Sequence, residues 1–423
     1  MLSPPEIALK KLFAVFFFLV NQVAFAQVIT GQVVDSVTLE PLPYVNIGIS
    51  QSTIGTLTNL DGRFSIDAST AKDKDSLRFS LLSYKHRSIA IASIKDSIRV
   101  KVSPSAYTLE EVVVSPQPPE EYIKEAIRRI PDNYINTPYN TRVYFREVVK
   151  LNGKYLNYTE AIMNAYNLPI TGAQDDSSRL QLIAMRHINE EDEAVKTIPI
   201  KRRKKKQDEI DSTIISLAAQ ASSQNGPYLL LDSGLVRRWY KYDSTRVFGG
   251  FHFRFKNVIP YDDRKLLNIS YGDKRKEERD REHGSLYLEE NNLAFESYTY
   301  QYSTIPAKVK AALFLFGYGM DDLRFRVKAT TQPTADGYIG DITILRADVS
   351  MEKIKWFKDN IPIVFETEAV MIVLDHQVSV INPCTEGIII QRGKAIYEQG
   401  ESNPDHPIWE QYKGVILPEG STF

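Results

Sequence analysis

The chain has 423 residues, 43% of them hydrophobic and 11% aromatic, so it can bury a large core in two or three domains. Its 52 basic and 53 acidic residues nearly cancel, which leaves no electrostatic attraction toward nucleic acid. The single cysteine excludes an intrachain disulfide. We expect Cys384 to be a small buried residue after the turn-forming Asn382-Pro383 rather than a nucleophile, since no His or Asn can be assigned to it.

Residues 1–26 have the pattern of a secretory signal peptide. A basic start precedes an apolar run over 12–20, which is far shorter than the roughly 20 residues needed to cross a bilayer. Ala24 and Ala26 have the A-x-A spacing that precedes cleavage, so we expect the mature protein to begin at Gln27. No cysteine lies near this point, and a lipoprotein is therefore not expected. The sequence predicts an exported protein, and export also removes nucleic acid as a partner.

Short bursts of alternating apolar residues fill the segment 27–114, separated by turn residues. Several short strands at close spacing predict an antiparallel β-sandwich. The strongest turn signal is Asn59 to Gly62, in which Asp61-Gly62 tolerates a positive φ. A fragment of a calcium loop is the alternative, but only Asn59 and Asp61 fit the ligand spacing, so we favour the turn.

Several motifs of this segment together resemble the carboxypeptidase regulatory-like domain. They are Gly31-x-Val33-x-Asp35, Pro41-Leu42-Pro43-Tyr44-Val45-Asn46-Ile47, Ile54-Gly55-Thr56, Thr58-Asn59-x-Asp61-Gly62-x-Phe64 and the closing Leu109-Glu110-Glu111-Val112-Val113-Val114. The resemblance covers 29 to about 114 and implies a transthyretin-like sandwich without catalysis of its own. It also implies the cell envelope of a Bacteroidetes-type bacterium, where we expect the protein in the periplasm or associated with the outer membrane.

The segment 115–119 is rich in proline and predicts a stiff hinge between two domains. A short helix is expected to follow, with acidic residues at its start and one apolar face, and to end at Pro131. The apolar face consists of Ile123, Ala126, Ile127 and Ile130.

The stretch from Ile123 to Ala161 resembles the linker and second domain of uncharacterised Bacteroidetes proteins that pair the same sandwich with a β-rich domain of unknown function. Some relatives continue into an outer-membrane β-barrel. Because this chain ends at Phe423, we expect neither a barrel nor a transporter role.

Residues 120–423 are expected to form a larger antiparallel β domain with a few helices, so the whole protein is predicted to be mainly β. Strands are expected from Val236 onward and, more specifically, at 142–149, 155–162, 251–255, 285–290, 294–302, 323–329, 342–349 and 363–374. Asn291-Asn292 should join a hairpin, and 363–374, which is apolar on both faces, should be the central strand. A helix is expected at 306–316, where it would cover one face of the sheet.

A polar insertion at about 171–226 is expected to be flexible. Its basic run, Lys201 to Lys206, predicts a solvated loop or transient contact with anionic lipid or polysaccharide, and 208–221 is a candidate helix.

Few residues point to catalysis. His187-x-x-Glu190 has the spacing of a zinc peptidase pair, but it lies in a polar segment without the parallel α/β pattern of such enzymes, so we expect no metal site there. The adjacent pairs Asp262-Asp263 and Asp321-Asp322 are expected to cap turns, because neighbours on a strand point to opposite faces. No nucleotide or nucleophile motif is present, and no cofactor is expected.

The aromatic residues of the second domain carry the remaining interest. Tyr298, Tyr300 and Tyr302 project from one face of a strand, and Trp239 and Tyr240 are expected near the start of another. They are either a core with a cross-strand aromatic ladder or a binding face for a glycan or an apolar ligand.

The leading hypothesis is a non-enzymatic envelope protein that binds or scaffolds an unknown partner, such as an outer-membrane protein, a glycan or a lipid. The alternative is a periplasmic carrier of lipid or another hydrophobic ligand, and a metal-dependent peptidase comes third. A deep cavity in the second domain would favour the carrier, and a filled core would favour the scaffold.

Overall fold

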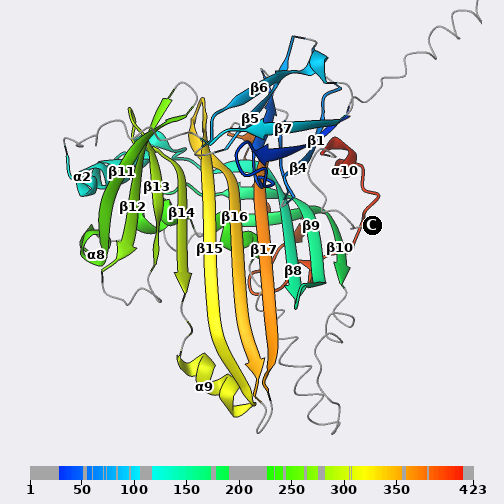
Figure 1. Cartoon of the computed structure of the whole chain (residues 1–423), viewed down its shortest axis with the longest axis vertical. Coiled ribbons are helices and arrows are strands. Elements are labelled where there is room, and N and C mark those ends of the chain that lie inside the picture. The colour runs from blue at the N-terminus through cyan, green and yellow to red at the C-terminus, as the bar shows by residue number, and fades with distance from the viewer. Residues whose placement is uncertain are drawn as a thin grey trace, which may run out of the picture. The chain divides into compact units, whose positions relative to one another are not determined.

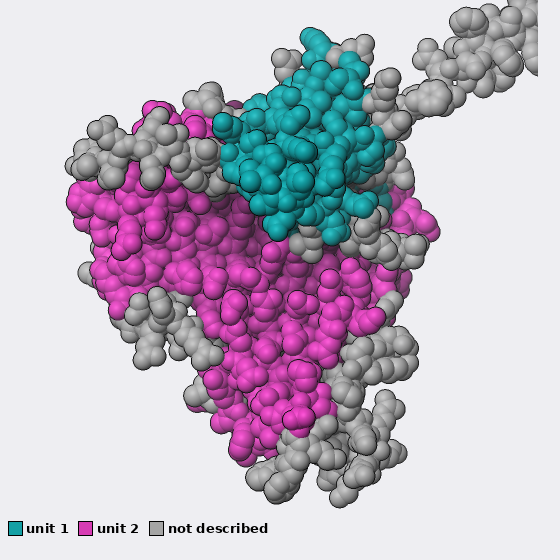
Figure 2. Space-filling model, in the orientation of Figure 1, with its two compact units in different colours: residues 1–108, 409–422 teal, residues 109–408, 423 magenta. Residues whose placement is uncertain are grey.

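The protein is described by a computed structural model, in which the chain forms two compact units (Figure 2). Unit 1 comprises residues 1–108 with 409–422, and unit 2 comprises residues 109–408 with 423. The structure describes residues 28–50, 55–59, 61–69, 71–72, 74–81, 84–94, 97–104, 117–172, 178–189, 226–232, 234–241, 244–261, 264–274, 282–303, 305, 307–354, 359–378 and 381–412. The predicted signal peptide, the basic run 201–206 and the candidate helix 208–221 lie outside these residues.

Unit 1 is a sandwich of two small sheets. Its strands are β1 (Val28–Asp35), β2 (Asn46–Ile49), β3 (Gly55–Leu57), β4 (Arg63–Asp67), β5 (Ser76–Ser80), β6 (Arg87–Ala90) and β7 (Ser97–Val102), with a 3-10 turn η1 (Ile91–Ser93). One sheet has the order β4-β1-β7 and the other β3-β2-β5-β6. The strand pairs of this sandwich are antiparallel, as predicted, apart from β1 and β7, which pair in parallel.

The predicted turn at Asn59 to Gly62 is confirmed. The side-chain oxygen of Asn59 accepts hydrogen bonds from the backbone amides of Asp61, at 3.0 Å, and Arg63, at 2.9 Å. Gly62 has a φ of +69°, and a Cβ there would lie 2.4 Å from the carbonyl oxygen of Val33. Only glycine fits this position without strain, because it has no Cβ.

Unit 2 is built on one antiparallel sheet of eleven strands (Figure 1). Its strands are β8 (Tyr139–Leu151), β9 (Lys154–Asn167), β10 (Arg179–Asn189), β11 (Phe251–Tyr261), β12 (Arg264–Asp273), β13 (His283–Glu289), β14 (Phe295–Ser303), β15 (Tyr318–Thr334), β16 (Gly337–Lys353), β17 (Ile361–Gln377) and β18 (Ile388–Ile389). The order across the sheet is β11-β12-β13-β14-β15-β16-β17-β8-β9-β10-β18.

Short helices pack against one face of this sheet. The helices of unit 2 are α2 (Pro119–Arg128), α3 (Ile130–Asn133), α6 (Gly226–Asp232), α7 (Leu235–Lys241), α8 (Ser244–Gly250) and α9 (Ala307–Leu315), followed by a 3-10 turn η3 (Ile396–Glu398), and α10 (Ile408–Gln411) starts at the end of the unit. Fully buried residues of α2, α3 and α7 share a core with inward residues of β8, β13 and β14, among them Ile123, Ile130, Trp239, Phe145, Leu286 and Phe295.

The long strands of unit 2 agree with the sequence. The hairpin of β13 and β14 turns at Asn291-Asn292, and β11 buries Phe253 while His252 and Arg254 are exposed. The expected central strand is β17, seventh of the eleven and next to the middle strand β16.

Four expectations about unit 2 are wrong. The insertion 171–226 contains β10, which pairs with β9 over its whole length and buries alternate residues such as Leu180 and Leu182. Residues 235–241 are helical rather than extended. Pro131 lies in the first turn of α3, where its missing amide costs no hydrogen bond.

The fourth error concerns Asp321-Asp322, which follow α9 in the chain. The helix itself forms as predicted and packs Leu313 against strand residues of unit 2, although the side chains of Phe314 and Leu315 are exposed. The aspartate pair lies inside β15, at a bulge, and not at a turn. Cys384 is fully buried, as expected, and its amide donates a hydrogen bond of 2.9 Å to the side chain of Asn382.

Candidate functional site

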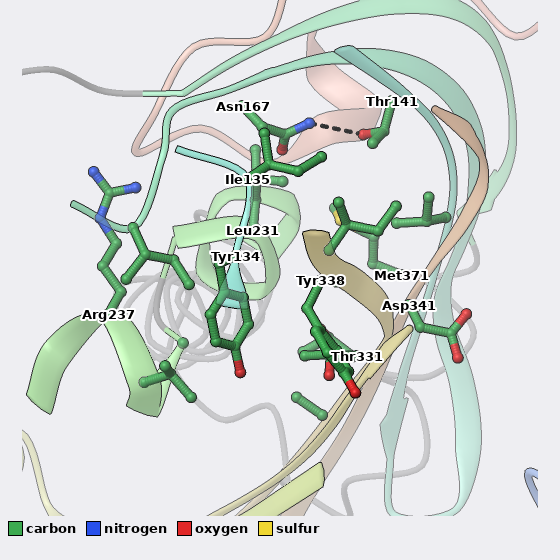
Figure 3. Close-up of a pocket in the computed structure, with 18 of the residues that line it drawn as sticks. Tyr134, Ile135, Thr141, Asn167, Leu231, Arg237, Thr331, Tyr338, Asp341 and Met371 are labelled. Atoms are coloured by element: carbon green, nitrogen blue, oxygen red, sulfur yellow. Dashed lines mark hydrogen bonds between the residues drawn. The ribbon is translucent and has the colours of Figure 1, made fainter. Parts of the chain in front are cut away.

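The core of unit 2 contains a cavity of about 140 Å³ (Figure 3). Its floor is one row of directly opposed residues on four neighbouring strands. Tyr298 of β14 pairs with Ala329 of β15, which pairs with Thr343 of β16, which pairs with Met371 of β17. Opposed residues in a sheet share a face, so all four side chains point to the helix-covered side.

A β-bulge forms one edge of the cavity. Between two regular pairs, β15 supplies only Thr330, whereas β16 supplies both Asp341 and Ile342. The hydroxyl of Thr330 accepts the Ile342 amide at 3.2 Å and lies 3.2 Å from a carboxylate oxygen of Asp341. Asp341 lies two positions before Thr343 on β16, so both side chains share the face that lines the cavity. Burial raises the pKa of Asp341 to about 6.

The connection between α6 and α7 forms the opposite side of the cavity. Leu230 and Leu231 of α6 and Val236 of α7 contribute apolar side chains. Gly234 lies between the two helices, and a Cβ there would approach the hydroxyl of Tyr298 to 3.1 Å. The absence of a side chain at this position therefore lets the helices lie close to β14.

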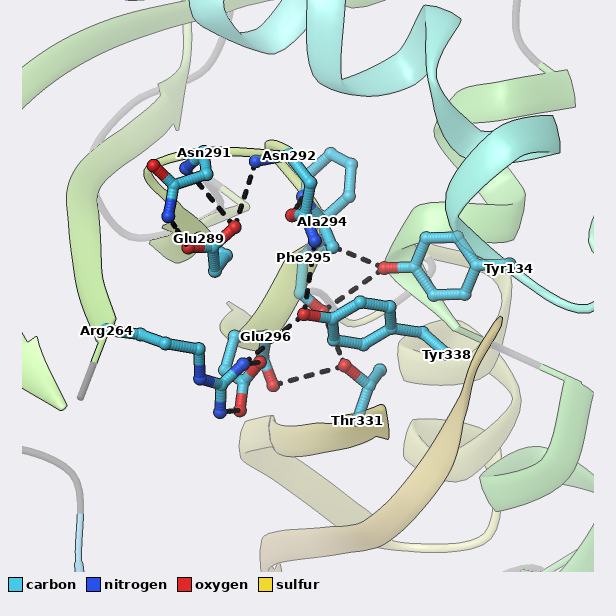
Figure 4. Close-up of polar contacts among 10 residues, drawn as sticks. All are labelled: Tyr134, Arg264, Glu289, Asn291, Asn292, Ala294, Phe295, Glu296, Thr331 and Tyr338. Atoms are coloured by element: carbon cyan, nitrogen blue, oxygen red, sulfur yellow. Dashed lines mark hydrogen bonds and ion pairs between the residues drawn. The ribbon is translucent and has the colours of Figure 1, made fainter. Parts of the chain in front are cut away.

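A rigid polar wall closes the cavity beside Tyr134 and Tyr338 (Figure 4). The hydroxyl of Tyr134 accepts the amide of Phe295 at 3.0 Å and donates to the carbonyl oxygen of the same residue at 3.2 Å. The hydroxyl of Thr331 donates to that carbonyl oxygen at 2.8 Å. The rings of Tyr134 and Tyr338 are 5.9 Å apart between centroids. Because the hydroxyls already have partners, this wall can hold its shape without a ligand.

An ion pair supports the wall from behind. Arg264 donates to both carboxylate oxygens of Glu296, at 2.9 and 3.0 Å, and to the hydroxyl of Tyr338 at 3.3 Å. Burial raises the pKa of Glu296, and the hydrogen bonds from Arg264 act in the opposite direction. Removal of either Arg264 or Glu296 would leave its partner as an unpaired buried charge, which is destabilising.

One cation at the cavity has no ion-pair partner among the described residues. Arg237 of α7 lines the cavity, and Figure 3 shows it on the side opposite Asp341. Burial raises the pKa of the nearby Tyr139 to about 12, and the positive charge of Arg237 acts in the opposite direction. The cavity thus combines an apolar interior with a guanidinium that no described carboxylate neutralises.

Of the aromatic residues singled out in the sequence, only Tyr298 lines the cavity. Tyr300 is buried and stacks on the half-buried Tyr302, with centroids 6.4 Å apart. Trp239 is fully buried in α7, where its ring packs against an aromatic group made up of Phe251, Phe253 and Tyr271. Tyr240, on the same helix, is partly buried against the core.

The residues that sequence reasoning missed are Tyr134, Tyr338, Arg237 and Asp341. One local signal was available. Apolar alternation along β16 breaks between Ile339 and Ile342, which are both buried although three positions apart, and such a break is typical of a bulge.

A second cluster of charges, in β8 to β10 and β17, is internally paired. Arg146 lies 3.1 Å from Glu368, and Arg186 lies 2.6 Å from Glu160, which also accepts a hydrogen bond from Tyr144. Buried charges that satisfy one another serve the structure of the sheet.

The zinc hypothesis gains no support from the described residues. His187 lies on β10 rather than in a loop or helix, and burial lowers its pKa. Glu190 lies outside the described residues, and within them no group of three or more His, Cys, Asp or Glu side chains could hold a metal ion.

Among the helices that the structure describes, none is long and apolar enough to cross a membrane.

Known structures resemble the chain only weakly. A DUF1329 family protein from Desulfovibrio piger is 9% identical, with 62% of this chain and 95% of that chain covered and a TM-score of 0.23. A LolA superfamily protein from Nitrosomonas europaea is 7% identical, with 63% and 96% covered and a TM-score of 0.22. A putative membrane-associated protein of unknown function from Bacteroides fragilis is 10% identical, with 83% and 98% covered and a TM-score of 0.14. Likenesses at this level carry no functional argument.

No curated protein matches the chain. A family model does match residues 29–114, the same segment whose motifs and two-sheet sandwich are described above. Residues 29–114 are therefore a CarboxypepD_reg-like domain, followed by a β-rich second unit.

Proposed function

We propose that the protein is a non-enzymatic binding protein of the cell envelope, and that unit 2 binds the apolar end of a small amphipathic ligand. The observation that carries this proposal is the cavity of about 140 Å³ beside the core of unit 2. Protein interiors are normally filled, so an opening of this size is a place where a ligand can gain contacts.

The volume of the cavity limits what can enter it. An engineered apolar cavity of roughly 150 Å³ in another protein holds one benzene molecule, whereas drug-sized ligands need roughly 300–1,000 Å³. The cavity of about 140 Å³ therefore suits six or so carbon atoms and cannot enclose a whole lipid. This favours a protein that grips the end of an acyl chain or a similar group over a carrier that encloses its cargo.

The chemistry of the lining indicates an amphipathic ligand. Polar residues also line the cavity, but apolar side chains make up a large part of its lining. They are Ile135, Ile170, Leu230, Leu231, Val236, Ile339, Met371 and Val373. Arg237 adds a positive charge that no described residue neutralises, so an anionic group such as a carboxylate is its natural complement. Asp341 on the other side would oppose an anion when it is ionised, and because burial raises its pKa to about 6, this opposition is removed only below about that pH.

The envelope setting rests on two features of the N-terminal part. Residues 1–26 have the pattern of a secretory signal peptide, and residues 29–114 are a CarboxypepD_reg-like domain, which is a non-catalytic module. We expect this module to serve as an adaptor for unit 2.

Titration calorimetry of the full chain with octanoate tests the proposal, with octylamine as the probe of opposite charge. We expect octanoate to bind more tightly than octylamine, and Arg237→Gln to remove the difference. Ala329→Leu would place three extra carbons in the cavity and should abolish binding of both probes. Ala335→Leu makes the same change at an exposed position of the turn between β15 and β16 and should bind like the wild type.

Two results would overturn the proposal. One is octanoate binding that Ala329→Leu leaves unchanged, because the ligand would then lie elsewhere. The other is metal-dependent hydrolysis of peptides by the purified protein. Native mass spectrometry of protein extracted from the envelope would identify the natural ligand.

A further inference from the structure

Helix α9 lies at one end of the long strands of unit 2 (Figure 1), and it exposes apolar side chains. Phe314 is 65% exposed, Leu315 is 83% exposed and Phe316, directly after the helix, is 55% exposed. Scattered surface leucines need no explanation, but three consecutive exposed residues of this size concentrate apolar surface at the end of α9, and we refer to them together as the patch.

The helix has no polar face to turn toward water. Between Ala307 and Leu315 its only polar residues are Lys308 and Lys310, and the apolar residues lie all round the axis. In soluble proteins a helix of this kind is normally buried, because it cannot hide its apolar surface against one neighbour alone. Among the side chains of α9 that the structure describes, only Leu313 reaches the core of unit 2, where it packs against a cluster that includes Tyr318 and Phe365.

The patch is nevertheless held firmly. The amide of Phe316 donates to the carbonyl oxygen of Leu313 at 3.0 Å, and the amide of Gly317 donates to that of Phe314 at 3.0 Å. Gly317 has a φ of +81° and accepts a hydrogen bond of 2.8 Å from the amide of Ile354. The exposed side chains therefore extend from an ordered turn, and binding through them orders little additional backbone.

The helix itself carries only positive charge. Lys308 and Lys310 are exposed, and no acidic residue occurs between Ala307 and Met320, whereas Asp321 and Glu352 lie on the adjoining parts of β15 and β16. Helix α9 lacks the separate polar face of an amphipathic interfacial helix, but exposed Phe and Leu side chains can enter the membrane interface while nearby lysines contact anionic lipid.

We propose that α9 docks unit 2 on an anionic lipid bilayer. The side chains of Phe314, Leu315 and Phe316 would enter the boundary between headgroups and acyl chains, while Lys308 and Lys310 contact lipid phosphates. This site is separate from the cavity and does not depend on a ligand there.

A second copy of the chain is a poorer occupant. The three side chains expose roughly 400 Å² together, if each offers roughly 200 Å² when fully exposed, whereas a stable interface buries about 800 Å² on each partner. Two copies would also bring like charges together at Lys308 and Lys310, whereas anionic phosphates are complementary to both.

Vesicle flotation of the full chain tests the proposal. We expect binding to vesicles of phosphatidylcholine and phosphatidylglycerol in equal parts, and weaker binding to pure phosphatidylcholine. Leu315→Ser should lower the partition coefficient about tenfold or more, because each buried methylene contributes about 0.8 kcal/mol. Val37→Ser removes a side chain that is similarly exposed, at 77%, but lies in unit 1, and it should bind like the wild type.

Three outcomes decide the matter. Lys308→Gln combined with Lys310→Gln should remove the preference for anionic vesicles, and an unchanged preference would overturn the role of charge. Failure of the wild type to float with either vesicle would overturn the docking itself. If the wild type dimerised in sedimentation experiments and Leu315→Ser abolished the dimer, the partner of the patch would be a second copy of the chain and not a membrane. Leu315 is exposed, so its substitution should leave the fold and octanoate binding unchanged.

Discussion

Replacing Asp341 by asparagine should stabilise the protein, and by an amount that depends on pH. Burial at the β16 bulge raises the pKa of Asp341 from 3.8 to about 6. Because the pKa is higher in the folded state, the folded protein is most stable at a pH below the unfolded-state pKa. It loses stability as the pH rises from there through the folded-state pKa. At 1.36 kcal/mol per pKa unit, the loss reaches about 3 kcal/mol near neutral pH.

An asparagine at this position cannot ionise, keeps the size of the side chain and can still hydrogen-bond to Thr330, so Asp341→Asn removes this loss. The variant should exceed the wild type in free energy of unfolding by about 3 kcal/mol at about pH 7.5 and by only about 1 kcal/mol at about pH 4.5. Urea titrations followed by tryptophan fluorescence at the two pH values measure both differences, and every other titrating group cancels between the two proteins.

Asp336→Asn is the matched control. Asp336 is exposed on the turn between β15 and β16, so the exchange should change the free energy of unfolding by less than about 0.5 kcal/mol at both pH values. If Asp341→Asn changed the stability equally at the two pH values, or destabilised the protein near neutral pH, burial of an ionised carboxylate at the bulge would be refuted.

Four further substitutions test the packing of the two units. Ala329→Leu should leave the free energy of unfolding unchanged or higher, because it fills the cavity, whereas Ala347→Leu in the filled core should cost about 1–3 kcal/mol in urea titrations. Arg264→Met should cost about 3 kcal/mol near neutral pH, because Glu296 loses its partner while 6% exposed, and unchanged urea stability would contradict this. Gly62→Ala should lower the midpoint of the unit 1 transition in calorimetry, since the new Cβ would lie 2.4 Å from a carbonyl oxygen, and an unaltered midpoint would contradict that close contact.

The strands of unit 2 were predictable because their signals are local. In β11 the alternation of Phe251, Phe253 and Phe255 with charged residues is complete within five positions, and the hairpin of β13 and β14 has its turn residues between the two strands. Helix α7 was missed because Trp239 and Tyr240 favour strands in isolation, while the helical spacing of Leu235 and Trp239 spans only one turn.

The cavity was not predictable, because its floor depends on the register of four successive strands and its walls come from segments far apart in the sequence, such as those of Tyr134 and Val236. Tyr298 faces Ala329 because β14 and β15, which α9 connects, pair in that register, and Met371 joins the row from β17. The extra residue in β16 also lets Tyr338 and Thr343 both line the cavity, although simple alternation would place residues five positions apart on opposite faces.

The pairing of β17 with β8 has a consequence for how unit 2 reaches its native state. Arg142 in β8 pairs with Asp375 in β17, so the first and last long strands of the unit become neighbours, whereas β8 to β10 and β11 to β17 each form by pairing neighbours along the chain. Contacts between residues so far apart in the sequence slow folding. The chain must lose conformational entropy to close the loop before these contacts can stabilise it. Until the two edges meet, each half of the sheet presents an open strand, and this interval is when unit 2 is most prone to aggregate.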